Sequence, residues 1–496
     1  MTTDSFVTHE AIFIDGDWVP SAARERLEVV SPWSEEVIAS VPSGSPEDMD
    51  RAVESAARAF RSGAWPEMSL DDRLAIVTRL RDLLVEHTED FAELITAEMG
   101  CPITQSRTVQ VSNPVRILEA YVDVARTYPF RSIRRSAVGQ ALVTRRPVGV
   151  VAGVVPWNVP LSLTMQKVVP SLVTGCTIVL KPAPETPLDA YLVARLLNEA
   201  GVPPGVVNVV PADRQASEYL VSHPEVAKVT FTGSSAAGRR IAEICGRDLR
   251  RVTLELGGKS AAVILDDADL DSAVSAMQMG SFRNNGQVCT LKTRLVVPRT
   301  SQPELLERIA ALVDSMPVGD PNDPATHIGP LVSERQRSRV EAYIDAGRAE
   351  GARLVRGGGR PAGLDHGWFV EPTVFADVDP DATIAQEEIF GPVVAVIPYD
   401  TEDEAIAIAN NSHYGLNGSV FTSDLDRGLR VAARIHTGTV ELNGQPAGFL
   451  APMGGVKWSG VGREFGPEGL EPFVETMSIG ISQDVADSLQ PVIEPK

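Results

Sequence analysis

From residue 148 onward, short apolar runs rich in β-branched residues alternate with stretches of helical spacing. The runs read VGVVAGVV, TIVL, GVVNVV and KVTFTG. Between two of them, residues 186–200 are opened by Thr186-Pro187 and closed by Gly201, which are start and stop signals of a helix. Alternation of this kind predicts a parallel sheet covered by helices. The chain is therefore expected to have an α/β fold.

A second α/β region begins near Ser260 with AAVILDDAD, continues through a helical pattern over residues 301–316, and ends with GSVFTSD and GTVELNG. With 496 residues, the chain exceeds what a single core usually holds, so at least two domains are expected. Nearer the start, Ser45 and Ser69 are each followed three residues later by an aspartate, which predicts two N-capped helices.

Two further segments, residues 130–146 and 471–482, have strand-like patterns with little core of their own. Such ribbons are interpreted either as subunit contacts or as an intramolecular hairpin, and the pattern favours neither.

Composition and charge exclude several classes of protein. Hydrophobic residues make up 43% and charged residues 22%, as in an ordinary globular protein. The net charge of -21 repels phosphate backbones and anionic lipids, so neither a nucleic-acid nor a membrane partner is expected. No basic-then-apolar start and no uninterrupted long apolar run occur, so neither a signal peptide nor a membrane span is predicted.

The four cysteines are scattered without C-x-x-C spacing, and none of the seven histidines has another at i+3 or i+4. The pattern supports neither a disulfide framework nor a metal site, and it favours a cytoplasmic location.

The segment FTGSSAAG predicts a strand that ends at Thr232 and a helix that starts near Ser234. Free N–H groups at such a helix start suit a phosphate or pyrophosphate. A P-loop NTPase is disfavoured because Arg239-Arg240 follow Gly238 where Lys-Ser/Thr is needed, and the G-x-G-x-x-G fingerprint is absent. A purely structural glycine turn remains an alternative.

Two polar side chains follow apolar strands. In VTLELGGKS, burial of the Glu255 carboxylate would raise its pKa and suit it to general-base work, although bonding to backbone amides is the commoner role. In VVPWNVP, Asn158 lies just past a strand, where its amide can donate into a ligand crevice or simply form a turn.

The loop RNNGQVCT places Cys289 after a polar, glycine-containing run. Most cysteines are inert buried residues, but this context favours an accessible thiolate of low pKa that acts as a nucleophile. A Cys/His protease is an alternative for which no histidine has a suitable context.

Seven segments, in order, resemble motifs of the aldehyde dehydrogenase superfamily, in its NAD(P)-dependent, hydrolytic, non-CoA-acylating form. They are PWNVP, KPAPETP, FTGSSAAG, LELGGKS, GQVC, EEIFGPV and GGVKWSGVGRE. The resemblance extends from FIDGDWV near the start to GREFGPEGL near the end. It implies a Rossmann-like dinucleotide-binding domain in residues 1–124 and 148–257, and a catalytic domain in residues 258–459. It also implies a β-ribbon oligomerisation element in residues 125–147 and 470–496, which forms homodimers or homotetramers.

The resemblance implies that Cys289 attacks the aldehyde, and that the Asn158 amide and the Cys289 N–H form the oxyanion hole of the thiohemiacetal. After hydride transfer to NAD(P), Glu255 activates water to hydrolyse the thioester. The residues implied to bind the cofactor are Val155, Pro156, Trp157, Lys181, Glu185, Gly233, Ser234, Gly257, Glu388 and Phe390. The residues implied to line the substrate pocket are Val159, Leu163, Gln166, Val288, Thr290, Phe449 and Met453.

Two positions depart from the family pattern. Pro184 stands where many NAD-preferring members have a ribose-binding Glu, with Glu185 next to it; NAD is expected and NADP stays open. Met453 stands where an aromatic is frequent. The pocket residues are mostly apolar and include no cationic clamp, so an uncharged aliphatic, terpenoid or aromatic aldehyde is expected.

Two rival functions remain. A CoA-acylating relative would release the acyl group to coenzyme A, which Glu255 disfavours. A non-catalytic member of the fold would need no nucleophile, base and oxyanion donor together.

Overall fold

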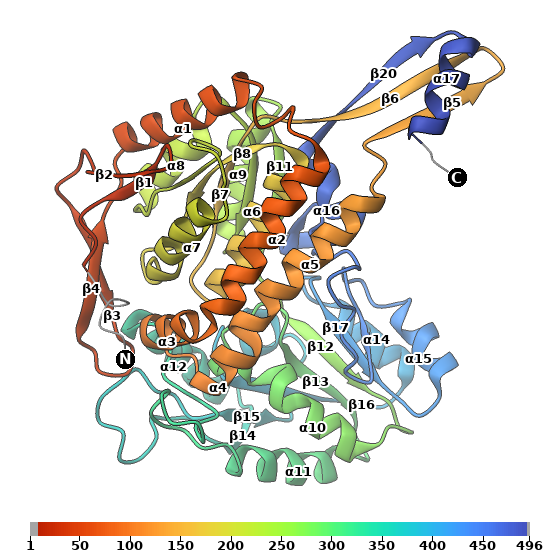
Figure 1. The fold of residues 1–496 in the computed structure, drawn as a ribbon. Coiled ribbons are helices and arrows are strands. Elements are labelled where there is room, and N and C mark those ends of the chain that lie inside the picture. Colours follow the sequence, from red (N-terminus) through yellow and green to blue (C-terminus); the bar gives the residue numbers. More distant parts are fainter. Residues whose placement is uncertain (1–7, 494–496) are drawn as a thin grey trace.

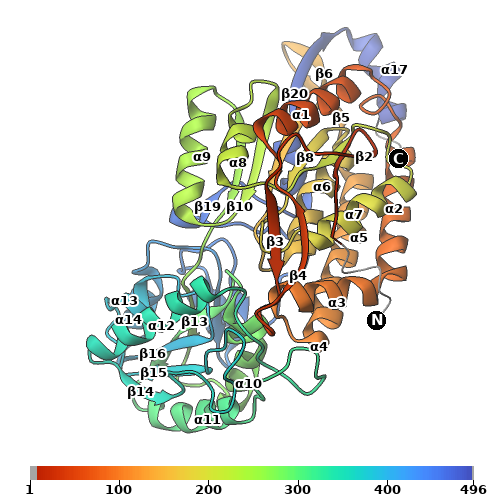
Figure 2. The ribbon, with the colours of Figure 1, turned by 90° about the vertical axis from the view of Figure 1, so that its left-hand side faces the viewer.

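The computed structural model describes residues 8–493; residues 1–7 and 494–496, at the ends of the predicted dinucleotide-binding and oligomerisation segments, lie outside the described residues. Two large sheets, each flanked by helices, form the body of the molecule, and a narrow ribbon projects from it (Figures 1 and 2). The predicted α/β fold is confirmed. Within residues 8–493, no helix is both long and apolar enough to cross a membrane.

The first sheet has eight strands in the order β19-β11-β10-β7-β8-β9-β1-β2. Its central strands β11, β10, β7, β8 and β9 run parallel, whereas β1 and β19 pair antiparallel with the edges. The bounds are β1 Ile12–Ile14, β2 Asp17–Val19, β7 Val150–Val154, β8 Thr177–Lys181, β9 Val207–Val209, β10 Val226–Thr232, β11 Arg251–Glu255 and β19 Gly460–Val461.

Two buried clusters fill the faces of this sheet, because its central strands are apolar on both sides. The helices of this part are α1 Pro46–Arg61, α2 Leu70–Glu86, α3 Thr88–Met99, α4 Ile103–Gln105, α5 Ser112–Thr127, α6 Pro160–Thr174, α7 Leu188–Glu199, α8 Arg214–Ser222 and α9 Ser235–Arg247. A π-helical turn, Ser106–Val111, lies between α4 and α5, and the two-stranded ribbon β3 Arg26–Val30 and β4 Val37–Pro42 lies apart from the sheet.

The predicted N-caps of the first two helices are confirmed. Ser45 and Asp48 form a complete capping box at the start of α1, and the Ser69 side chain accepts from the Asp72 N–H in α2. The expected Thr186 cap is wrong. Instead, the buried carboxylate of Glu98 accepts hydrogen bonds from the first N–H groups of α7, a tertiary contact that no local pattern reveals.

The second sheet has seven strands in the order β14-β15-β16-β13-β12-β17-β18, parallel except for β14. Its strands are β12 Ser260–Ile264, β13 Lys292–Pro298, β14 Arg353–Arg356, β15 Thr373–Ala376, β16 Val393–Tyr399, β17 Gly418–Phe421 and β18 Glu441–Leu442. Its helices are α10 Leu270–Ser281, α11 Gln302–Asp314, α12 Glu334–Ala349, α13 Thr383–Gln386, α14 Glu402–Asn410 and α15 Leu425–Ala432.

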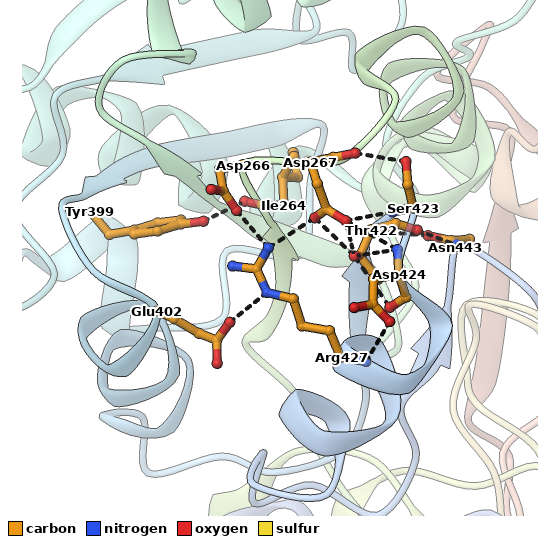
Figure 3. A network of polar contacts seen from close by, with 10 residues as sticks. All are labelled: Ile264, Asp266, Asp267, Tyr399, Glu402, Thr422, Ser423, Asp424, Arg427 and Asn443. Atoms are coloured by element: carbon orange, nitrogen blue, oxygen red, sulfur yellow. Dashed lines mark hydrogen bonds and ion pairs between the residues drawn. The ribbon is translucent and has the colours of Figure 1, made fainter.

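A polar network ties together the segments that follow β12, β16 and β17 (Figure 3). Arg427 on α15 binds Asp266 at 2.7 Å, Asp267 at 3.2 Å and Glu402 at 2.7 Å. Asp267 in turn accepts from the Thr422 hydroxyl at 2.7 Å. The network connects the segments that follow the three strands, and Asn443 joins it by accepting from the Thr422 N–H (Figure 3).

The projecting ribbon consists of β5 Arg131–Ser136, β6 Gly139–Pro147 and β20 Val474–Ile481, paired antiparallel in the order β20-β6-β5. Short elements, α16 Gly466–Leu470 and a 3₁₀ turn over Glu471–Phe473, lead into β20, and α17 Gln483–Ile493 follows it. The hairpin interpretation is therefore confirmed for residues 130–146, and the C-terminal segment adds a third strand to the hairpin. The subunit-contact interpretation stays a prediction.

Candidate active site

Four of the motifs follow neighbouring parallel strands of the first sheet. Asn158 follows β7, Gly233 follows β10, Lys181 ends β8 and Glu255 ends β11. Because the carboxyl ends of parallel strands meet at one edge, the sequence-predicted residues gather there, where open α/β sheets bind ligands. The predicted strand ends at Thr232 and Glu255 are confirmed, and Ser234 caps α9 as predicted.

The loop that carries Cys289 lies between α10 and β13 and is held by one of its own side-chain amides. It begins with the 3₁₀ turn Arg283–Gly286, in which Asn284 and Asn285 have left-handed backbones with φ of 53° and 59°. The buried Asn285 amide donates to the carbonyls of Gly100 at 2.9 Å and Pro330 at 2.8 Å. The polar run therefore builds a turn that is fixed by its own amides.

Cys289 differs from the other three cysteines, which are all buried, because its side chain is partly exposed. It lies opposite Gly258: a Cβ at Gly258 would come within 2.4 Å of the Cys289 carbonyl oxygen. Glycine is needed at position 258 because no side chain fits between the two loops.

Asn158 reaches this loop directly. Its Nδ2 donates to the Gln287 carbonyl at 2.9 Å, and its own carbonyl accepts from the Asn284 amide at 2.8 Å. The Asn158 side chain is buried, and its Nδ2 carries a second N–H beside the one given to Gln287. This geometry suits an oxyanion donor that is held in place before the reaction, rather than an Asn that only forms a turn.

Glu255 is buried, and neither of its carboxylate oxygens has a hydrogen-bond partner among the described residues. The bonding to backbone amides that was the alternative reading is therefore not observed. Burial and then the nearby Glu464 raise the pKa of Glu255 well above its ordinary value, while Lys167 and Arg463 act in the opposite direction. An unbonded carboxyl of raised pKa is suited to exchange a proton with a bound water.

The expected low pKa of Cys289 is wrong for this structure. Burial raises the pKa of the thiol to about 12, and the carboxylates of Glu388 and Glu255 add to the effect, while Arg283 lowers it. The polar loop suggested a solvated thiolate, but the two carboxylates come from distant parts of the chain, so the local pattern could not reveal them.

Sequence reasoning missed a buried ion pair beside Glu255. The Lys167 ammonium of α6 contacts the Glu464 carboxylate, and both side chains are at most 4% exposed. Glu464 lies within the motif GGVKWSGVGRE, which was a signal that could have identified it. Lys167 stands in a helix whose residues are all buried, where a lysine is unusual.

At the same strand edge, a cavity of about 280 Å³ adjoins Lys181 and Pro184. Phe231 and Ile241 form apolar walls, and Arg214 contributes a cation. Burial lowers the pKa of Lys181 to about 8, while Glu185 and Asp213 oppose this shift. A cavity with apolar walls and a lysine among its lining residues fits an adenosine group.

The remaining residues predicted to bind the cofactor lie as follows. The Val155 N–H donates to the Lys181 carbonyl at 3.1 Å, and the Gly233 N–H to the Glu255 carbonyl at 3.0 Å. Pro156 lies in the turn between Val155 and Trp157. The Glu185 carboxylate, which acts electrostatically on Lys181, binds Arg335 at 3.2 Å.

Glu388 rests against the two glycines that follow β11. Its carboxylate accepts from the Gly258 N–H at 2.8 Å, and a Cβ at Gly257 would lie 2.4 Å from it. Burial raises the pKa of Glu388 to about 7. Trp157 and Phe390 meet edge to face at 5.4 Å between ring centroids. The structure thus brings the two predicted aromatic residues together.

The predicted substrate residues divide into two groups. Val159, Leu163, Phe449 and Met453 belong to one apolar cluster, whereas Val288 and Thr290 flank Cys289. Gln166 is buried, and its Oε1 has no partner among the described residues.

The predicted positions themselves include no cation, but Arg283 lies next to one of them. The Arg283 guanidinium donates to the Thr290 hydroxyl at 3.1 Å. Arg283 stands at the first letter of RNNGQVCT, but the resemblance assigned it no role. Within residues 8–493, no group of three or more His, Cys, Asp or Glu side chains could hold a metal ion.

Comparisons with known proteins identify the family. A sequence model described as the Aldehyde dehydrogenase family matches residues 18–479. Geranial dehydrogenase of Castellaniella defragrans is 45% identical over 95% of this chain and 99% of its own. A betaine aldehyde dehydrogenase of Rhizobium leguminosarum is 42% identical over 94% of this chain and 96% of its own.

Among solved structures, an aldehyde dehydrogenase of Mycobacterium tuberculosis in complex with NAD+ superimposes with a TM-score of 0.94 at 45% identity, covering 96% of this chain and 98% of that chain. Aldehyde dehydrogenase C of Pseudomonas syringae, a cysteine-to-alanine mutant with NAD+ and octanal, has a TM-score of 0.92 at 41% identity, covering 95% and 96%. The chain belongs to the aldehyde dehydrogenase family.

Proposed function

We propose that this protein oxidises an uncharged aldehyde to the carboxylic acid and reduces NAD, with Cys289 as nucleophile, Asn158 as oxyanion donor and Glu255 as general base. The observation that supports it is the convergence of these three side chains. Asn158 bonds to the loop of Cys289, and Glu255 acts electrostatically on the thiol. A second candidate function, that of a non-catalytic member of the fold, does not explain why these three side chains lie together.

Cys289 would attack the aldehyde carbon, and the free N–H of the Asn158 amide, together with the Cys289 N–H, would bind the developing oxyanion. Bound nicotinamide supplies the hydride acceptor that this oxidation needs. Glu255 would then take a proton from water, which attacks the Cys289 thioester and restores the thiol. Because burial raises the pKa of Glu255, the base form is populated at a higher pH than it is for an ordinary glutamate.

We also propose that this chain binds NAD along the carboxyl edge of the first sheet. The cavity beside Lys181 fits an adenosine, and the start of α9 at Ser234 offers N–H groups to the pyrophosphate. Glu388 and Phe390 would lie on the nicotinamide side, near Gly257. Pro184 leaves the ribose without the carboxylate that excludes NADP, so weaker use of NADP is expected.

For the substrate, we propose an aliphatic, terpenoid or aromatic aldehyde. The support is the apolar character of the predicted pocket residues Val159, Leu163, Phe449 and Met453, together with two relatives: geranial dehydrogenase by its name, and the octanal-bound structure by its ligand. Release of the acid to water rather than to coenzyme A follows from Glu255, and added coenzyme A should yield no thioester.

The chain is proposed to divide into the three parts predicted above: dinucleotide-binding, catalytic and ribbon. The ribbon of β5, β6 and β20 exposes Met477 and Ile479 at 39% and 37%, which supports a role in a homodimer or homotetramer. A cytoplasmic location is proposed on the scattered, unpaired cysteines.

The test is reduced-nicotinamide formation by the purified protein with NAD and NADP, over geranial, octanal, benzaldehyde, betaine aldehyde and succinic semialdehyde. Cys289→Ala should lower kcat by roughly a thousandfold or more. Cys245→Ala, which removes a buried thiol outside the site, should retain activity. A preference for betaine aldehyde or succinic semialdehyde would contradict the substrate class, and activity in Cys289→Ala would contradict the mechanism.

A further inference from the structure

Three charged side chains, Arg283, Lys292 and Glu441, line one cavity next to the Cys289 loop. The Lys292 ammonium binds the Glu441 carboxylate at 2.6 Å, and these side chains are only 7% and 18% exposed. The Asn417 amide donates to the other Glu441 oxygen at 2.9 Å. Arg283, Lys292 and Glu441 together line a cavity of about 1120 Å³.

Residues of the polar network in Figure 3 also line this cavity, namely Thr422, Ser423 and Asn443. That network is fixed by Arg427 and its three carboxylates, so the cavity has a rigid boundary on the side of β17 and β18. The charged side chains therefore sit in a built environment rather than on a mobile surface.

Arg283 closes the Cys289 loop on itself. It begins the turn at one end of the loop, and its Nη2 donates to Thr290 Oγ1 at 3.1 Å, at the other end. The Asn417 amide, which holds Glu441, also reaches the Thr290 carbonyl at 3.4 Å. The residue after Cys289 is thus held by a cation and by an amide.

The charges that face Cys289 come from three elements. Glu255 of β11 and Glu388, in the segment after α13, oppose formation of the thiolate, and Arg283 is the positive group that favours it. Arg283 in turn interacts electrostatically with Glu441, the partner of Lys292. A guanidinium keeps its charge at every physiological pH, so its effect on the thiol does not itself titrate.

We propose that Arg283 is a positioning residue for the catalytic cysteine: it holds Thr290 and supplies the positive charge that favours the Cys289 thiolate. Glu441 sets the strength of that charge by partly neutralising it. The inference rests on the proposed role of Cys289 as nucleophile, and it adds to that role a charge carried by the same loop.

The test is the rate of alkylation of Cys289 by iodoacetamide between pH 7 and 10, in protein without nicotinamide or aldehyde, with the modified peptide quantified by mass spectrometry. Only the thiolate reacts, so the rate reports its fraction. Arg283→Met should slow alkylation roughly tenfold, the effect of one pKa unit. Arg283→Lys, which keeps the charge, should stay within about threefold of the wild type. Glu441→Gln leaves two cations unopposed and should accelerate alkylation.

Arg299→Met is the matched control, because it removes an exposed arginine paired with Asp400 and should leave the rate unchanged. An unchanged rate in Arg283→Met would overturn the proposal, as would faster alkylation in that variant, which is what a merely loosened loop predicts. If Arg283→Met does not fold, a rate in Glu441→Gln at or below that of the wild type overturns it. Alkylation requires neither the aldehyde nor the nicotinamide cofactor. A wild-type protein that forms no reduced nicotinamide would therefore reject the proposed function, whereas the effect of Arg283 on the alkylation rate of Cys289 would still stand.

Discussion

Lys167 and Glu464 form an ion pair that is buried at both ends and adjoins Glu255. Only one Glu464 oxygen meets the ammonium, and the other has no partner among the described residues. Glu464 raises the pKa of Glu255, and Lys167 lowers it. The protonation state of the proposed base therefore depends on a pair that contacts neither the thiol loop nor the adenosine cavity.

Replacing Lys167 by Met should shift the rising limb of the pH–kcat profile to higher pH, because Glu255 loses the cation that favours its charged form. The same change leaves Glu464 as an uncompensated buried charge, so the free energy of unfolding should fall by about 3–5 kcal/mol. Activity is measured from pH 6 to 10, and stability by urea denaturation.

Replacing Glu464 should shift the rising limb of the pH–kcat profile in the opposite direction. Glu464→Gln removes the carboxylate that disfavours ionisation of Glu255, so the limb should move to lower pH. Lys167→Arg retains the charge and serves as control. If Lys167→Met and Glu464→Gln moved the limb of the pH–kcat profile in the same direction, the electrostatic account of Glu255 would be wrong.

Gly258→Ala tests the close approach between the loop after β11 and the Cys289 loop. The added Cβ would lie 2.4 Å from the Cys289 carbonyl oxygen, which is backbone and cannot rotate away. A displacement of this kind misaligns the nucleophile, so kcat/KM should fall roughly a hundredfold. Gly246→Ala is the control, because nothing lies within 4 Å of its Cβ and it stands in α9. It should retain full activity, and equal losses in both variants would contradict the contact.

Much of this arrangement can be predicted from the sequence, because it depends on local patterns. Apolar runs ended by Thr232 and Glu255 predict strands, and Ser45 and Ser234 predict the helix starts that the structure shows. Since parallel strands share a carboxyl edge, motifs that follow different strands are expected to lie near one another. The motifs of Asn158 and Glu255 both reach the Cys289 loop at this edge, Asn158 by a hydrogen bond and Glu255 by its charge.

What could not be predicted depends on contacts between distant segments. The cap of α7 is Glu98, about 90 residues before the helix. Burial raises the pKa of Cys289, against the expectation from the polar loop, and Glu388 adds to this effect from about a hundred residues away in the sequence. Arg283 could be seen in the sequence, but its contact with Thr290 follows from the left-handed turn at Asn284, which no periodicity reveals.

Pro184→Glu should increase the preference for NAD over NADP. A carboxylate there would face the ribose end of the cavity beside Lys181, where it can accept from ribose hydroxyls and repel a 2′-phosphate. The ratio of kcat/KM values for the two cofactors should rise roughly tenfold, equivalent to about 1.4 kcal/mol. Pro184→Gln introduces a side chain as long as that of Glu but without the charge. If the ratio of kcat/KM for NAD over NADP rose equally in this variant, repulsion of the 2′-phosphate would be excluded as the cause.

At the start of α7, the carboxyl groups of Glu98 and Asp189 are both buried next to each other. Glu98 accepts two backbone N–H groups, whereas neither oxygen of Asp189 has a partner among the described residues. Burial, and for Glu98 also the charge of Asp189, raises the pKa of each, in the case of Asp189 from 3.8 to about 7. The folded protein therefore holds a proton that the unfolded chain releases.

Asp189→Asn should accordingly stabilise the protein at pH 8 and change little at pH 4. Because the pKa of Asp189 is higher in the folded state, its favourable contribution is complete below pH 3.8 and is lost as the pH rises to about 7. A shift from 3.8 to about 7 corresponds to a loss on the order of 4 kcal/mol, and the variant escapes this loss because an amide cannot ionise. Urea denaturation at both pH values measures it, with the exposed Asp71→Asn in the first turn of α2 as control. A gain in stability of equal size at pH 4 and pH 8 would show that Asp189 is ionised in the folded state, against the raised pKa.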